Sequence, residues 1–233
     1  MKVSRWHKYY SEARQQVEDL GFLNEIEWQR AQQPATVSES TFLREAAWVV
    51  MCSGFRESTV RKCFDFISLC FCEWESAQTI AFNSKVCVES ALIVFGNRAK
   101  MEALAAIAKL VASQGFDNFF DAVTEDHLTE LQKLPFIGPI TAMHLAKNLG
   151  FDIAKPDRHL VRLCANLGFR GVDEMCEVFS NESGDSIRVV DIVLWRYCEQ
   201  NPHTVFHDAE IFSQTTNSHS FESKKILKSY AIN

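Results

Sequence analysis

The residues best suited to chemistry lie between positions 131 and 163, where a turn rich in Pro and Gly precedes a single aspartate. Pro135 cannot continue a helix because it has no N–H to donate. Gly138 permits a backbone bend that other residues resist, and Pro139 suits the first position of a new helix. The segment Leu-Gln-Lys-Leu-Pro-Phe-Ile-Gly-Pro-Ile-Thr-Ala therefore predicts a helix, a hairpin over 134–142, and a second helix.

A hairpin of this kind directs backbone N–H groups outward at the start of a helix. Such groups suit a phosphate oxygen and do not discriminate between bases. Lys147, Arg158 and Arg162 add positive charge nearby along the chain. The alternative is a plain tight turn between packed helices, and a bare Pro-x-x-Gly-Pro sequence favours that alternative.

Asp157 follows Pro156 and directly precedes a segment with helical apolar spacing, His-Leu-Val-Arg-Leu-Cys-Ala-Asn-Leu-Gly. An aspartate in this position is most often only a helix N-cap. A carboxylate held rigidly there can also stabilise positive charge that develops on a substrate, or orient and deprotonate water.

Taken together, the hairpin and Asp157 resemble the signature of the helix-hairpin-helix DNA glycosylases. That signature is hydrophobic-Pro-x-hydrophobic-Gly-x-x-Thr-Ala, then a loop, then an Asp that opens a helix and is often followed by His and Arg. Asp157 comes seventeen residues after Ile140, and His159 and Arg162 match the later positions. A looser similarity extends over roughly residues 40 to 200.

The resemblance implies that the chain removes a base from its sugar and that Asp157 is catalytic. The transition state of this reaction resembles an oxocarbenium ion, which a nearby carboxylate stabilises. Family members that also cleave the strand carry a lysine between the hairpin Gly and the Thr-Ala pair. That place is Ile140 here, which cannot form a Schiff base. The expected activity is therefore monofunctional hydrolysis that leaves an abasic site. Lys155 and Lys85 could replace the missing lysine, but the favoured interpretation of each is an exposed surface lysine.

The resemblance also implies a set of DNA contacts. Hairpin and flanking residues are expected to bind the backbone: Phe136, Gly138, Ile140, Thr141, Lys147, Arg158 and Arg162. Excision requires the nucleotide to leave the base stack, so a wedge and a pocket are needed. Phe55 or Arg56 would fill the gap in the duplex, and the remaining pocket candidates are Ser53, Trp48 and His159. Core packing explains Phe55 equally well, and a solvated helix end explains Arg56 equally well. Core packing is the favoured explanation for Trp48, and packing or a phosphate contact explains His159 as well as a site role does.

The expected partner is double-stranded DNA, bound by a monomer. The excised base stays open among alkylated, oxidised, deaminated and mismatched bases and the hypermodified bases of phage DNA, the last implying antiviral defence. No metal or other cofactor is expected, although a monovalent cation held by hairpin carbonyls would fit the resemblance. A non-catalytic helix-hairpin-helix DNA-binding protein and an unrelated helical scaffold are the alternatives.

Apolar residues recur at helical spacing almost throughout, and nine Gly and five Pro are few for a fold rich in β-turns. Ser38 or Ser40, Thr124, and Asp185 or Ser186 are expected to cap helices, and Gly115 to end one. The predicted fold is all-α with two lobes and a DNA-binding cleft between them. One lobe would span 41–156, the other 1–40 with 157–233, and the polar tail after 202 is expected to be flexible.

Composition narrows the class of protein further. The net charge is −6, but residues 133–170 carry six Lys or Arg against two Asp, a local +4. A basic face on an acidic body permits phosphate contact at one surface. No secretory signal or long apolar run is present, and the eight cysteines contain no C-x-x-C. These features favour reduced thiols, no membrane span and a bacterial cytosolic or nucleoid-associated location.

Overall fold

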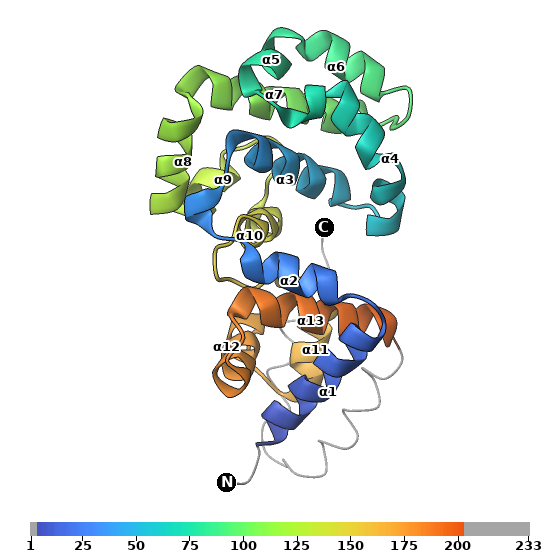
Figure 1. Cartoon of the computed structure of the whole chain (residues 1–233), viewed down its shortest axis with the longest axis vertical. Helices are drawn as coiled ribbons and strands as arrows, with labels where there is room; N and C mark the ends of the chain where they lie inside the picture. Colours follow the sequence, from blue (N-terminus) through green and yellow to red (C-terminus); the bar gives the residue numbers. More distant parts are fainter. Residues whose placement is uncertain (1–3, 203–233) are drawn as a thin grey trace. The chain divides into compact units, whose positions relative to one another are not determined.

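A computed structural model of the chain describes residues 4–202, which form thirteen α-helices and two short 3₁₀ helices (Figure 1). No strand occurs among these residues, so the predicted all-α class is confirmed. Backbone contacts divide the chain into two compact units. Unit 1 combines residues 1–31 with 152–233, and unit 2 comprises residues 32–151. The tail that was expected to be flexible lies outside the described residues.

Unit 1 is a helical bundle built from both ends of the chain. Its helices are α1 (Arg5–Asp19), α2 (Leu23–Ala31), α11 (Arg158–Leu167), α12 (Val172–Ser183) and α13 (Ile187–Gln200). Helix α13 packs against the other four. Fully buried apolar side chains from both parts of the chain fill the centre, among them Tyr10, Val17, Ile26, Phe179 and Leu194. Unit 1 therefore needs residues 1–31 as well as residues after 152 to close its core.

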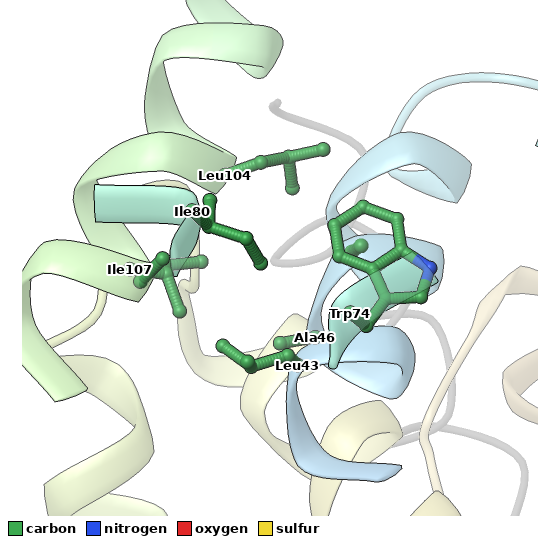
Figure 2. A pocket seen from close by; sticks show the side chains of 8 residues that line it. Leu43, Ala46, Trp74, Ile80, Leu104 and Ile107 are labelled. Carbon is green, nitrogen blue, oxygen red and sulfur yellow. The ribbon is translucent and has the colours of Figure 1, made fainter. Parts of the chain in front are cut away.

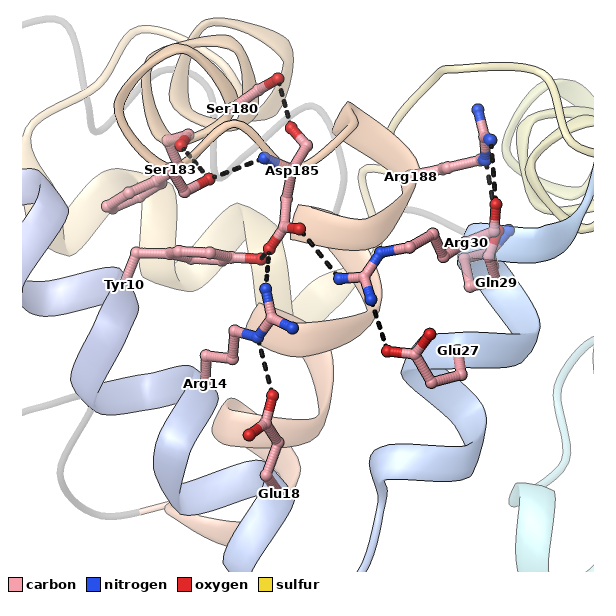
Figure 3. Close-up of polar contacts among 11 residues, drawn as sticks. Tyr10, Arg14, Glu18, Glu27, Gln29, Arg30, Ser180, Ser183, Asp185 and Arg188 are labelled. Carbon is pink, nitrogen blue, oxygen red and sulfur yellow. Dashed lines mark hydrogen bonds and ion pairs between the residues drawn. The ribbon is translucent and has the colours of Figure 1, made fainter.

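A buried carboxylate joins three segments of unit 1 (Figure 3). The side chain of Asp185, which precedes α13, is only 9% exposed. It accepts a 2.8 Å hydrogen bond from the Tyr10 hydroxyl and forms ion pairs with Arg14 at 2.6 Å and Arg30 at 3.0 Å. Burial, followed by the charge of Asp185, raises the pKa of Tyr10, which keeps its hydroxyl a donor. Helices α1 and α2 are thus fastened to the loop between α12 and α13.

Unit 2 contains the remaining elements in chain order. They are the 3₁₀ turn η1 (Pro34–Thr36), α3 (Glu39–Cys52), α4 (Glu57–Cys70), η2 (Cys72–Trp74), α5 (Ala77–Phe82), α6 (Ser84–Ala91), α7 (Arg98–Gln114), α8 (Phe116–Glu125), α9 (His127–Gln132) and α10 (Pro139–Asn148). Helix α3 packs against α4, α5, α7, α10 and η2. Its apolar residues cover most of its circumference, which is why it lies at the centre of the unit.

Local sequence signals set most helix boundaries in unit 2. The Ser38 hydroxyl accepts a hydrogen bond from the Thr41 N–H and caps α3. Gly115, with φ 78°, ends α7 as predicted. The predicted cap at Thr124 is wrong: its hydroxyl donates to the Phe120 carbonyl inside α8, and Asp126 caps α9 instead. A carboxylate is a stronger acceptor for the free N–H groups of a helix start, so the aspartate takes that position.

The apolar core of unit 2 contains a small gap between α3, η2, α5 and α7 (Figure 2). Trp74, Leu43 and Ile80 turn their side chains toward it, together with Ala46, Ala47, Leu104, Ile107 and Ala108. The gap leaves no room for a water molecule and has no charged side chain in its lining. It is a packing defect of the kind that stays dry, and it offers no site for chemistry.

None of the helices between residues 4 and 202 has the length and apolar character needed to cross a lipid bilayer. Within the same part of the chain, no group of three or more His, Cys, Asp or Glu side chains is placed to hold a metal ion. All eight cysteines are free thiols, and Cys87, Cys164, Cys176 and Cys198 are buried.

Candidate functional site

The predicted hairpin connects α9 to α10 in unit 2. The Ile137 N–H donates a 3.1 Å hydrogen bond to the Leu134 carbonyl, which closes a β-turn with Pro135 and Phe136 at its centre. Leu134 and Ile137 are buried and anchor the turn. Phe136 has φ 66°, the left-handed conformation that the second central residue of a type II turn requires. Glycine is the usual residue there, and a bulky aromatic one is strained.

Gly138 does not supply the bend that its residue type predicted. It is extended, with φ −87° and ψ −177°, a conformation open to any residue. No heavy atom lies within 4 Å of the place where a Cβ would be. Glycine therefore leaves open space beside the first turn of α10. The first hydrogen bond of that helix runs from the Ala142 N–H to the Gly138 carbonyl. The N–H groups of Ile140 and Thr141 precede that bond, as at every helix start.

Lys147 does not fit its expected role as a phosphate contact. Its residue surface is only 4% exposed, near the C-terminal end of α10. The error has a simple cause: Lys147 follows the inward residues Leu145 and Ala146, and the hairpin resemblance said nothing about the direction of this side chain. Ile140 is 36% exposed, and Thr141 is half-buried.

Lys100, in the first turn of α7, is a buried lysine at the junction of two loops. Its residue surface is 3% exposed. Its ammonium group donates to three carbonyls at the C-terminal end of α3, those of Val50, Met51 at 3.3 Å and Ser53 at 2.6 Å. A cation in this place satisfies the last carbonyls of the helix and complements its dipole. Burial lowers the pKa of Lys100.

Two exposed aromatic rings lie over the same ammonium group. The Nζ atom of Lys100 is 5.2 Å from the ring centroid of Phe55 and 5.5 Å from that of Phe136. Phe55 is 42% exposed and Phe136 is 46% exposed. Phe55 also rests on Phe95, with ring centroids 5.1 Å apart. The structure thus brings the predicted wedge loop and the predicted hairpin together within unit 2.

Of the other wedge and pocket candidates in unit 2, Ser53 and Arg56 lie beside Phe55, whereas Trp48 lies elsewhere on α3. Ser53 and Arg56 are exposed and flank Phe55, Ser53 at the end of α3 and Arg56 just before α4. Trp48 is half-buried on α3 and packs edge-on against Phe64 at 5.0 Å. The guanidinium group of Arg61 lies 5.4 Å from the Trp48 ring. These contacts account for Trp48 as part of the packing between α3 and α4.

Asp157, in unit 1, is the N-cap of α11. Its Oδ1 accepts hydrogen bonds from the N–H groups of His159 at 2.9 Å and Leu160 at 3.1 Å. Its Oδ2 lies 3.7 Å from Nζ of Lys155, and the two side chains are 16% and 17% exposed. The backbone N–H of Lys155 is itself held at 2.7 Å by the buried carboxylate of Asp191. One oxygen of Asp157 is therefore fixed by the helix, while the other faces a lysine.

The side chains near Asp157 on α11 and α13 differ widely in burial, from buried Cys198 to exposed Arg158. His159 is half-buried, 6.4 Å edge-on from Trp195, and burial lowers its pKa while Asp157 opposes that effect. Burial, with the nearby charge of Asp157, raises the pKa of Cys198 to about 12, so this thiol is no nucleophile at neutral pH. Arg158 is exposed and Arg162 is half-buried on α11.

Sequence reasoning did not assign Lys100 a role of its own, although the signal was present. Lys100 begins the apolar stripe of α7, next to Met101 and one turn before Leu104. A lysine on the buried face of a helix needs a partner, which indicates a structural or functional role.

Comparison with protein-family models, with curated proteins and with solved structures finds no match for this chain.

Proposed function

We propose that the protein is a monofunctional DNA N-glycosylase of the helix-hairpin-helix type, with Asp157 as its catalytic carboxylate. The observation that carries the proposal is the arrangement of Asp157. Two backbone N–H groups fix one of its oxygens, the other oxygen lies 3.7 Å from the Lys155 ammonium group, and the side chain as a whole is 16% exposed. A carboxylate that is held rigidly and remains partly accessible is suited to charge stabilisation. The match of the hairpin and Asp157 to the glycosylase signature supplies the reaction class.

In the proposed reaction the bond between C1′ and the base breaks, and the base leaves with the bonding electron pair. The Asp157 carboxylate stabilises the positive charge that develops on the sugar. Water adds its hydroxyl group to C1′, Asp157 accepts the proton, and the departing base is protonated in turn. The products are a free base and an abasic site. Repair lesions and hypermodified phage bases are both candidate substrates.

The experiment that tests the proposal is Asp157→Asn. Asparagine keeps a side-chain oxygen for the N-cap, so we expect a change in unfolding free energy of only a few tenths of a kcal/mol. It removes the negative charge, so we expect base release to fall at least about a hundredfold. The substrates are DNAs with alkylated, oxidised, deaminated or mismatched bases and phage DNA with hypermodified bases. Released base and alkali-labile sites are measured.

Asp173→Asn is the matched control, because Asp173 is an exposed aspartate in the first turn of α12. It should release base at the wild-type rate. Borohydride should trap no covalent complex with DNA, since Ile140 occupies the lysine position of the lyases. Unchanged base release by Asp157→Asn would contradict the assignment of Asp157.

A non-catalytic DNA-binding protein is the second candidate function. The two hydrogen bonds to Oδ1 favour it, because they explain Asp157 as a helix cap without any chemistry. In that case wild-type protein binds DNA but releases no base from any of these substrates. Asp157→Ala would then cost about 1 kcal/mol of stability through the lost cap, and Asp157→Asn would change nothing.

A further inference from the structure

Phe136 combines a strained backbone conformation with a largely exposed aromatic ring. Its backbone is in the left-handed region, at φ 66°, where a bulky L-residue is disfavoured and glycine is not. The residue is nevertheless 46% exposed, so burial of its ring contributes little to stability. Strained residues of this kind cluster at functional sites, which makes Phe136 a candidate for a functional role.

Phe55 shares the same support. Both ring centroids lie within 5.5 Å of Lys100 Nζ, which three carbonyls at the end of α3 hold in place. The ammonium group attracts the negative faces of both rings. Two loops that are about 80 residues apart in the sequence therefore place exposed aromatic rings beside the same buried ammonium group.

We infer that Phe55 and Phe136 form one base-stacking surface, with Lys100 as its positioning residue. The ligand class is an unpaired nucleobase in DNA, such as the base left opposite a nucleotide that has been flipped out. Exposed aromatic rings bind every base through its π-face, and one such stack contributes about tenfold or more to affinity. The inference rests on the proposed function, since both require the protein to bind DNA.

Binding is measured by fluorescence anisotropy on two duplexes of one sequence. One carries a single unpaired base opposite an abasic-site analogue, and the other is fully paired. We expect Phe55→Ala and Phe136→Gly each to lower affinity for the unpaired base about tenfold. Affinity for the paired duplex should stay within about twofold, because phosphate contacts dominate it. Phe82→Ala is the matched control, an 89% exposed phenylalanine on α5, and should bind both duplexes like wild type.

Stability separates this role from packing. Phe136→Gly relieves the left-handed strain, so its midpoint of urea unfolding should be unchanged or higher while binding selectivity falls. A phenylalanine that mattered only for packing would lose stability instead. Unchanged selectivity in both phenylalanine variants overturns the inference.

Lys100 is tested with Lys100→Met, which keeps the hydrocarbon stem but loses the ammonium group. We expect the same selective loss for the unpaired base, with an unchanged salt dependence of binding. A lysine that touched phosphate would instead lower the salt slope by about one. Lys100→Arg should restore part of the selectivity, since a cation returns. A lower salt slope in Lys100→Met, with selectivity retained, contradicts the positioning role.

The outcomes separate this inference from the proposed function. If the protein binds the unpaired base through both rings but releases no base, the stacking inference is supported and the glycosylase assignment is contradicted. If the protein releases base but both phenylalanine variants keep full selectivity, the glycosylase assignment is supported and the stacking inference is contradicted. Absence of DNA binding overturns both.

Discussion

Glu45 is a single buried residue whose charge matters for the stability of unit 2. It lies on α3, 5% exposed, where it accepts a 2.9 Å hydrogen bond from Asn148 and lies 3.5 Å from the exposed guanidinium group of Arg44. Burial raises the pKa of Glu45, and the Asn148 hydrogen bond only partly opposes this effect. The folded protein therefore holds a proton on Glu45 more tightly than the unfolded chain does.

The sign of the pH dependence follows from linkage. The stabilisation of the folded state that comes from protonated Glu45 is fully present below its ordinary pKa of 4.5. It is lost as the pH rises through the raised pKa of the folded protein. We expect Glu45→Gln to remove this dependence, because glutamine can still accept the Asn148 hydrogen bond without a charge. The variant should be more stable than wild type at pH 8, by about 1 kcal/mol, and the difference should vanish near pH 4.

Urea unfolding across that pH range checks the prediction. Glu45→Ala serves as the comparison, since it leaves Asn148 without its acceptor and should be less stable than wild type at both pH values. A Glu45→Gln variant that is less stable than wild type at pH 8 would mean that the ion pair with Arg44 outweighs desolvation.

At the scale of elements, the connection from α10 to unit 1 depends on one glycine. Gly150 has φ 97°, and a Cβ atom there would lie 2.7 Å from the backbone of Gln32 and of Gln33. Both the dihedral angle and the close backbone contact exclude a side chain. We expect Gly150→Ala to destabilise the protein by about 3 kcal/mol, from left-handed strain and overpacking together.

Gly168→Ala is the control, because Gly168 also has a positive φ, of 81°, but open space around its Cβ position. It should cost only about 1 kcal/mol. Denaturation midpoints of the two variants measure the difference, and equal costs would show that the contact with Gln32 and Gln33 yields without strain.

Elements were predictable from sequence where the signal was local. The helical spacing gave the all-α class, and Ser38, Gly115 and Pro139 marked boundaries that the structure has. Where several residues competed for one cap, the outcome depended on their partners: Thr124 lost the cap of α9 to Asp126. Of the two candidates for the start of α13, Ser186 is the N-cap residue, and Asp185 enters an ion-pair network instead. The positive φ fell on Phe136 rather than Gly138, because the turn closes between Leu134 and Ile137 and puts residue 136 in the strained place.

In the candidate site, the direction of each side chain was harder to predict than the position of its residue in a helix or turn. The helix start at Asp157 follows from the neighbouring sequence, and the structure places its carboxylate as a cap. The burial of Lys147 and the contacts of Lys100 depend on how α3, α7 and α10 pack, which spacing along one helix does not encode. The gathering of Phe55 and Phe136 around Lys100 likewise joins segments from three parts of the sequence.

At the scale of the whole molecule, the chain order makes unit 2 an insertion within unit 1. Residues 1–31 supply α1 and α2, whose Tyr10, Val17 and Ile26 are fully buried in the core of unit 1. Each buried side chain of this size contributes about 2 kcal/mol, so the three together rival the net stability of a small domain. Unit 2, by contrast, is one continuous segment whose core residues all lie between 32 and 151.

We therefore expect deletion of residues 1–31 to unfold unit 1 and to leave unit 2 folded. Hydrogen exchange followed by mass spectrometry should show that amides in α11, α12 and α13 lose protection, while those in α3 and α7 keep it. The isolated segment 32–151 is the matching control and should show the same protection in α3 and α7 as the full chain. Loss of protection in α3 and α7 after the deletion would mean that unit 2 cannot hold its fold without unit 1. Since Asp157 is in unit 1, the same deletion should abolish base release, whereas Phe55 and Phe136 should keep their place around Lys100 in unit 2.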